Sequence, residues 1–167
     1  MRLVPPARAG KPLVLVAVGI LAGCGGAGGG GTQPVTGDGF RFSAPVGWTV
    51  AQTARSAAAS SGAVNRVEVQ TFRLLRPYRA DLFAAASREL DRVAGDLAVQ
   101  LRGRLTSRAT TQVAGRDARS YRIDYDSRVS EITFVLDGRR EYELLCRRPA
   151  DAGSDTCAAF VKSFELG

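Results

Sequence analysis

The feature that most constrains the fold is a pair of alternating runs around a single Asp-Gly dipeptide. Apolar residues recur at every second position over residues 132–136 and again over 142–146, on either side of Asp137-Gly138. Such alternation gives a strand one buried face and one exposed face, and Asp-Gly between two such runs is typical of a two-residue hairpin turn. The chain is therefore expected to contain an antiparallel sheet.

Other stretches carry the same period-two pattern or interrupt it. Residues 51–62 are small and polar, and they predict a loop between strands. The stretch over 64–75 has apolar residues on both faces, which indicates a strand that is covered on both sides or bulged midway. Further strands are expected over 40–50, in two parts around a proline-glycine turn, and over 110–113 and 117–126, joined at Ala114-Gly115.

Residues 81–105 follow a helical pattern instead. Apolar side chains recur at steps of three or four from Leu82 to Leu101, with arginines and acids on the opposite face. This predicts an amphipathic helix with Asp81 as its cap. The modest, alanine-rich apolar face favours packing on a sheet over lying on a membrane surface. Gly95 in mid-helix predicts a close approach to that sheet.

A short helix is expected near the C-terminus, capped by Asp155 or Thr156, with Phe160 and Phe164 directed to the core. The order of elements is then strands, a long helix, strands and a helix, which is typical of an α+β fold. We expect one α+β domain over residues 39–167, in which a central antiparallel sheet is packed by one long helix and a short C-terminal helix.

At the start of this domain the stretch FRFSAPVGWTV resembles the opening signature of the PsbP-like fold, an aromatic-rich strand leading into Pro-x-Gly-Trp. The order of elements also resembles that of small actinobacterial lipoproteins of the LpqN type. The resemblance implies an α/β/α sandwich and no reaction, because members of this fold serve mainly as accessory or binding subunits. The residues that carry it are Phe40, Phe42, Pro45, Gly47 and Trp48, with FVKSF over 160–164, which is similar to the family's terminal helix.

The amino terminus has the layout of a bacterial export signal. Residues 1–11 carry three positive charges and no negative ones, and an uncharged apolar run follows over 12–21. Leu21-Ala22-Gly23-Cys24 then resembles the lipobox, in which cleavage leaves the cysteine as the first residue of a lipoprotein. We therefore expect a signal peptide over 1–23 and a diacylglyceryl thioether, with palmitate-type chains, on Cys24.

A chain lipidated at Cys24 would be anchored in the cell membrane on its extracytoplasmic face. The glycine-rich residues 24–38 are expected to form a flexible linker without structure of its own. Two alternatives stay open for the amino terminus: an ordinary secretory signal with a chance cysteine, or a buried hydrophobic strand of the domain.

Cys146 and Cys157 remain as an even pair in a compartment that would be oxidising. They flank the polar residues 147–156, and this spacing is far longer than the CxxC of redox sites. We predict a structural disulfide that ties the last strand to the final helix; two free thiols or a redox pair are the alternatives.

The composition excludes several classes of catalytic and metal-binding site. The chain has no histidine, so it lacks the commonest general base and the commonest transition-metal ligand. We expect no zinc site, no histidine-based triad, no metal and no cofactor. Glu141 with Glu143, and Asp124 with Asp126, share strand faces and are interpreted as solubilising charge rather than as an acid–base pair, so no catalytic residue is assigned.

The formal charge of +7 is carried almost wholly by arginine. Arg139, Arg140, Arg147 and Arg148 bracket the last hairpin strand and form a candidate basic patch for anionic lipid head groups or wall polymers. A solvated, salt-bridged face is the alternative. No nucleic-acid partner is expected, because no aromatic platform motif accompanies the arginines. Trp48, on the turn of the PsbP-like signature, is the other candidate for an interaction surface; the simplest interpretation of this residue is a core or edge-packing aromatic.

These features favour a non-catalytic, lipid-anchored accessory or protein-interaction module of the cell envelope, with the membrane and an envelope protein as partners. The alternative is a carrier that binds a lipid or other hydrophobic ligand between the long helix and the sheet, where alanines leave room. An envelope hydrolase is the third and least favoured hypothesis.

Overall fold

The computed structural model describes residues 30–167; the predicted signal peptide and Cys24 lie outside them. The main sheet has seven strands in the order β3-β4-β5-β9-β8-β7-β6, and all neighbours are antiparallel. No helix of the described residues is long and apolar enough to cross a membrane. The strands of this sheet are β3 (Thr49–Gln52), β4 (Ser56–Ser61), β5 (Asn65–Arg73), β6 (Arg104–Val113), β7 (Arg116–Tyr125), β8 (Arg128–Asp137) and β9 (Arg140–Pro149).

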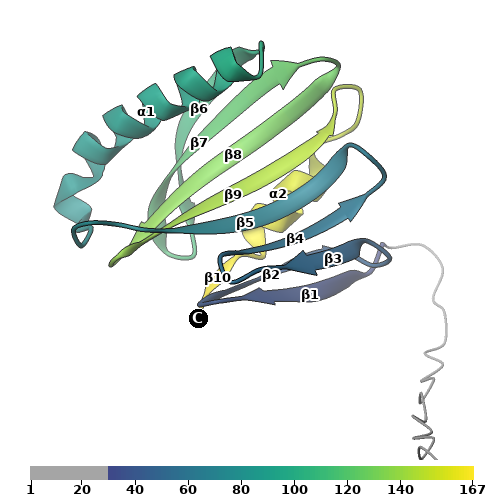
Figure 1. Cartoon of the computed structure of the whole chain (residues 1–167), viewed down its shortest axis with the longest axis horizontal. Helices are drawn as coiled ribbons and strands as arrows, with labels where there is room; N and C mark the ends of the chain where they lie inside the picture. The colour runs from purple at the N-terminus through teal and green to yellow at the C-terminus, as the bar shows by residue number, and fades with distance from the viewer. Residues whose placement is uncertain (1–29) are drawn as a thin grey trace, which may run out of the picture.

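A second antiparallel sheet has three strands in the order β1-β2-β10. Figure 1 shows the long helix α1 lying across one face of the main sheet and the short helix α2 behind the opposite face. The layers are thus α1, the main sheet, and a third layer made of α2 and the small sheet. The remaining elements are β1 (Thr32–Gly37), β2 (Phe40–Pro45), β10 (Glu165–Leu166), the 3-10 helix η1 (Ala80–Leu82), α1 (Phe83–Gln100) and α2 (Asp155–Lys162).

Each face of the main sheet has its own hydrophobic core. Beneath α1, three helix residues pack on alternate residues of β7 and β8, because side chains two apart on a strand share a face. This smaller core consists of Leu90, Ala94, Ala98, Tyr121, Ile123, Ile132 and Phe134. The larger core lies on the other face, between β4, β5, β9 and the third layer.

Five aromatic rings join the small sheet, α2 and β9 in the larger core. Phe42 meets Phe160 edge-on with ring centroids 5.0 Å apart, and Tyr142 meets Phe164 at 5.6 Å. Phe40 lies 6.1 Å from the ring of Tyr142. All five side chains are buried. The aromatic residues at the two ends of the domain therefore pack into one core, where such pairs contribute more than their buried area alone.

The predicted hairpin forms, with Gly138 and Arg139 as its two turn residues instead of Asp137 and Gly138. β8 and β9 pair from Asp137 with Arg140 back to Arg128 with Pro149. Gly138 has a φ of +54°, a conformation that glycine adopts without steric cost in a tight turn.

The helix predicted over 81–105 is shorter than its apolar pattern. α1 ends at Gln100, and Arg102 turns the chain with a φ of +52°. A Cβ on Gly103 would lie 2.8 Å from the carbonyl oxygen of Asp124, so the backbones are in contact there. The chain then continues directly into β6.

Two predictions about α1 were wrong. Asp81 does not cap the helix; its carboxylate pairs instead with Arg79, with Nη2 and Oδ2 2.8 Å apart. Gly95 makes no close approach to the sheet, because a Cβ there would have no neighbour within 4 Å. Ala94 and Ala98 provide the contact, and they are 1% and 5% exposed.

Residues 51–62 form strands β3 and β4 with their turn instead of the predicted loop. Ala57 and Ala59 are fully buried in the larger core. Their small side chains let the two sheets approach closely at β4. Alanine has a low strand preference, so tertiary packing and not local propensity makes this segment a strand.

The predicted linker was also wrong over part of its length. β1 pairs with β2 along all six of its residues, and Val35 is 1% exposed in the larger core. Pro34 is tolerated because β1 is the edge strand of its sheet, where a missing N–H donor costs little. The domain therefore includes residues 32–38, ahead of the predicted start at residue 39.

Cys146 and Cys157 form the predicted disulfide, with the sulfur atoms 2.03 Å apart. The bond joins β9 to α2, and both cysteines are buried. The predicted cap by Asp155 or Thr156 was wrong, because no side chain caps α2. The disulfide and the buried ring of Phe160 hold this helix on the sheet.

Replacing Cys146 and Cys157 together by alanine should lower the free energy of unfolding by about 3 kcal/mol, because the bond closes a loop that restricts the unfolded chain. Urea unfolding in oxidising buffer measures the difference. Dithiothreitol should destabilise the unmodified protein by a similar amount and leave the double variant unchanged. An equal response of both proteins would contradict a stabilising bond.

Candidate functional site

Four segments that are distant in sequence meet at one end of the domain, which we call the arginine end. They are the turns β1–β2, β3–β4 and β8–β9 and the last residues of β5. Together they line an open hollow of about 750 Å³, the arginine hollow. Its polar lining is Asp38, Arg55, Thr71, Arg73, Arg139 and Arg140.

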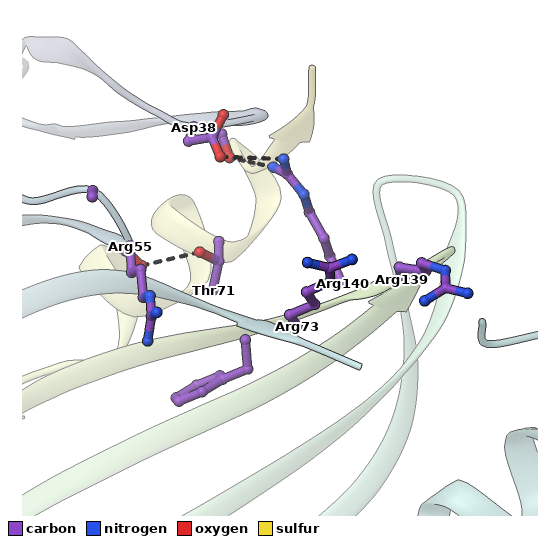
Figure 2. A pocket seen from close by; sticks show the side chains of 8 residues that line it. Asp38, Arg55, Thr71, Arg73, Arg139 and Arg140 are labelled. Atoms are coloured by element: carbon purple, nitrogen blue, oxygen red, sulfur yellow. Dashed lines mark hydrogen bonds and ion pairs between the residues drawn. The ribbon is translucent and has the colours of Figure 1, made fainter. Parts of the chain in front are cut away.

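The arginine hollow holds four guanidinium groups and one carboxylate. Figure 2 shows the side chain of Arg140 reaching to Asp38, with Arg73 beside it and with Arg55 and Arg139 to either side. Across residues 30–167, the side chains of Arg55, Arg73 and Arg139 form no ion pair or hydrogen bond. Three positive charges are therefore uncompensated by protein groups.

Strand register places two of these arginines directly opposite each other. Arg73 on β5 pairs with Arg140 on β9, so both side chains project from the same face. Directly opposed residues of antiparallel strands have Cβ atoms about 5 Å apart, and like charges at such positions are destabilising.

Asp38 partly compensates this repulsion. Arg140 donates from Nη1 to the carbonyl oxygen of Asp38 at 2.8 Å, and its Nη2 lies 3.2 Å from Oδ2. Gly39 makes room for this contact, because a Cβ there would overlap Nη1 of Arg140. The Asp38 side chain is 70% exposed, so water competes for it. An exposed pair of this kind is weak.

Backbone hydrogen bonds hold two more arginines in place. Thr71 donates from its N–H and its hydroxyl to the carbonyl oxygen of Arg55, at 2.8 and 3.2 Å. The N–H of Leu74 donates to the carbonyl oxygen of Arg139 at 2.9 Å. The backbones of Arg55 and Arg139 are thus fixed, while both residues remain exposed.

The structure divides the arginine patch predicted around β9. Arg140 and Arg147 are seven residues apart along an extended strand, or about 24 Å. Arg148 is 6% exposed and donates to Glu131 and to the carbonyl oxygen of Ala152, at 2.9 and 2.6 Å. Arg147 donates to the carbonyl oxygen of Val64 at 3.1 Å. This pair therefore holds two loops and forms no surface patch with Arg139 and Arg140.

Trp48 lies at the opposite end of the domain from the arginine hollow. It is half-buried against the larger core, and its carbonyl oxygen accepts from Nε2 of Gln33 at 2.8 Å. The neighbouring Val46 is 63% exposed, and its N–H donates to the carbonyl oxygen of Gly31, where the chain leads into β1. The predicted Trp48 surface and the arginines are therefore separate.

A second hollow, of about 350 Å³, lies between the start of α1 and the adjoining part of the main sheet; we call it the apolar hollow. Glu141 faces it and is half-buried, and burial raises the pKa of its carboxyl group. Burial, then the charges of Glu141 and Glu68, raise the pKa of Glu143. These glutamates are thus less exposed than predicted. The apolar lining is Leu74, Pro77, Tyr78, Leu82, Ala85, Ala86, Leu90 and Leu136.

Asp91 anchors α1 on the sheet. Its carboxylate accepts from Arg119 at 3.0 and 3.1 Å and from the hydroxyl of Tyr121 at 2.7 Å. The hydrogen bonds from Arg119 and Tyr121 lower the pKa of Asp91, and burial raises that of Tyr121. This is a paired, satisfied network beneath a helix, which indicates a structural role.

The chemistry of the arginine hollow is anion recognition. Guanidinium groups present planar pairs of N–H donors that match the oxygens of carboxylates and phosphates. Among the residues described, no group of three or more Cys, Asp or Glu side chains is arranged to hold a metal ion.

Sequence reasoning missed Arg55 and Arg73. Arg55 lies in the segment taken as a loop, and Arg73 lies at the end of a strand whose partner was not predicted. Arg73 is the final residue of β5, and Arg140, two residues after Gly138, is the first residue of β9. Only the β5–β9 register brings the two together.

The comparisons show what the fold is similar to. No protein-family model and no curated protein matches the chain. The solution structure of cyanobacterial PsbP (CyanoP) from Synechocystis is similar, with a TM-score of 0.59 and 14% identity over 88% of this chain and 99% of that one. A crystal structure from Bacteroides thetaiotaomicron has a TM-score of 0.55 and 12% identity, over 77% of this chain. The present chain spans 45% of that protein.

These likenesses show the fold. The antiparallel sheets, the long helix and the short C-terminal helix have the PsbP-like arrangement that the opening signature predicted.

Replacing Arg73 by glutamine should raise the free energy of unfolding by about 0.2–1 kcal/mol, because it removes one of two opposed like charges. The gain should shrink as salt is added, since ions screen exposed charges. Urea unfolding at low and high salt measures both effects. Arg88→Gln, on the exposed face of α1, is the matched control and should change little. A loss of stability in Arg73→Gln would contradict the repulsion.

Proposed function

We propose that this protein is a non-catalytic binding module of the bacterial cell envelope, anchored to the extracytoplasmic face of the membrane through lipidated Cys24. The lipobox and the resemblance to LpqN-type lipoproteins support the anchor. In this proposal the arginine end is the surface that meets a partner, which is an accessory role and not a catalytic one.

The observation that carries the proposal is the polarity of β1. The chain leads into β1 at Thr32, which pairs with Pro45 near the Trp48 turn, and leaves it at Gly37, next to Asp38. Six residues of strand span about 20 Å. The C-terminus lies beside the arginine end, where the N–H of Gly167 donates to the carbonyl oxygen of Gly39 (Figure 1).

The chain between Cys24 and Thr32 limits how the domain can sit on a membrane. These eight steps reach at most about 28 Å when fully extended. For the arginine hollow to contact the bilayer, most of this extended chain would have to run back alongside β1. In this proposal the short reach favours an orientation of the anchored domain in which the arginine end points away from the membrane, toward other envelope components.

The test is photo-cross-linking in intact bacterial cells, with a photoreactive residue at position 139 or, as a control, at position 46. Both positions are exposed but lie at opposite ends of the domain. We expect a discrete adduct from position 139 that Arg73→Gln removes, and none from position 46. Equal labelling from the two positions would contradict a partner surface at the arginine end.

The anchor is tested in the same cells. Cys24→Ser should move the protein from the membrane fraction to the soluble fraction, because the acyl chains supply the membrane affinity. A protein that stays in the membrane fraction after this change would contradict lipid anchoring at Cys24.

The apolar hollow supports a second candidate function, the carriage of a hydrophobic ligand between α1 and the sheet. Eight of its lining residues are apolar, which suits an acyl chain or ring, and Arg76, Glu89 and Glu141 are its charged residues. Exposed Leu75, 97% accessible, borders this region in the β5–α1 connection.

Native mass spectrometry of the full-length protein tests the carrier function. A carrier should retain extra mass that leaves on collisional activation. Ala86→Leu, which fills the hollow, should abolish the adduct, whereas Ala84→Leu on the exposed side of the same helix should keep it. A bare protein, or equal adducts in both variants, would contradict carriage in this hollow.

A further inference from the structure

We propose that the arginine hollow is a binding site for phosphate groups and that the carboxylate of Asp38 competes with phosphate for Arg140. This deepens the proposed function by naming the ligand chemistry of the same surface. Phosphate binding concerns the protein in solution and does not depend on lipidation of Cys24, whereas the assignment of the phosphate to a ligand outside the bilayer rests on the proposed anchor.

The arginine hollow carries an excess of positive charge. Four guanidinium groups against one carboxylate leave three positive charges facing one hollow. A single carboxylate ligand would leave most of this charge uncompensated, whereas a phosphate monoester carries about 1.5 to 2 negative charges near neutral pH and a pyrophosphate group carries more. The charge of the hollow therefore favours phosphate over carboxylate.

Strand pairing holds Arg73 and Arg140 close together. Their opposition across β5 and β9 is set by a ladder of eight paired residues, so neither side chain can leave the face on which it lies. An anion bound between two such guanidinium groups converts their repulsion into two attractive, charge-assisted hydrogen-bonded contacts. Arg73 has no acidic partner in the described chain, which leaves its donors available.

Asp38 lies where it can compete with a bound anion. It is the acidic residue of the hollow and it contacts Arg140, the arginine opposite Arg73. Its pair with Arg140 is solvent-exposed and therefore weak enough for a more highly charged anion to displace. Gly39 leaves space for the Arg140 guanidinium over the turn, next to the hollow.

The size and direction of the hollow bear on which molecule carries the phosphate. The hollow is open and large, with a volume of about 750 Å³, which suits a phosphate group carried on a larger molecule. The polarity of β1 directs it away from the point where the chain leads to Cys24. We therefore infer a phosphate-bearing ligand outside the bilayer and not a head group of the anchoring membrane.

Isothermal titration of the full-length protein in a neutral detergent, with pyrophosphate as the probe, tests the site. At about 0.02 M salt, where screening is weak, we expect saturable binding. Arg73→Gln should weaken it by about tenfold or more, because a charged hydrogen-bond partner is lost. Asp38→Asn should strengthen it about two- to fivefold, as expected for removing an exposed competing pair.

The control variant Arg88→Gln removes the same charge from the exposed face of α1 and should leave the dissociation constant unchanged. Acetate should bind more weakly than pyrophosphate. An absence of saturable binding, or equal losses in Arg88→Gln and Arg73→Gln, would overturn the site. No gain in Asp38→Asn would overturn the competitor role. Circular dichroism of each variant shows that a loss is not due to unfolding.

A vesicle arm distinguishes the two sources of phosphate. The full-length Cys24→Ser protein is sedimented with vesicles of phosphatidylglycerol and phosphatidylcholine, with and without Arg73→Gln. We expect Arg73→Gln to leave the bound fraction unchanged. A bound fraction that falls with Arg73→Gln would overturn the assignment to a phosphate-bearing ligand outside the bilayer.

Discussion

The rest of the structure depends on the pairing of strand β9 with β5 on one side and β8 on the other. β9 pairs with β8 along its whole length, and with β5 from Arg140 opposite Arg73 to Arg147 opposite Arg66. Because side chains alternate, this register sends Tyr142 into the larger core together with Leu144 and Cys146. A slip of one residue would put glutamates there instead. The disulfide then fixes α2 to the same strand.

The same register creates the arginine hollow. The arginines of this hollow differ from other arginines of the domain in their partners. Arg148 and Arg119 each have a carboxylate partner, Glu131 and Asp91, and both serve to hold neighbouring segments. Arg73 instead faces another arginine. A local arrangement that opposes stability, at an exposed end made from four separate segments, is typical of a binding site rather than of a scaffold.

Sequence patterns predicted the elements whose apolar periodicity is strong. The β8–β9 hairpin, β5 and α1 all carry a clear period, and the aromatic residues of FRFSAPVGWTV and of FVKSF meet in one core as members of a PsbP-like fold. β1 and β4 were missed because their proline, glycine and alanine residues have low strand preference. These strands form because Val35, Ala57 and Ala59 are buried between the two sheets. A short stretch of sequence does not show how the layers of the fold pack on one another.

The sequence shows which residues are charged, but only the tertiary structure shows which of them lie together. The chain alone indicates an export signal, a disulfide, an α+β fold and an excess of arginine without histidine. The tertiary structure decides that Arg139 and Arg140 join Arg55 and Arg73, and that Arg147 and Arg148 do not join them. The physical reason is that a strand is about 3.4 Å long per residue and pairs with distant segments. Neighbours in sequence are therefore carried to opposite ends of the sheet, while residues far apart along the chain meet through hydrogen-bond register.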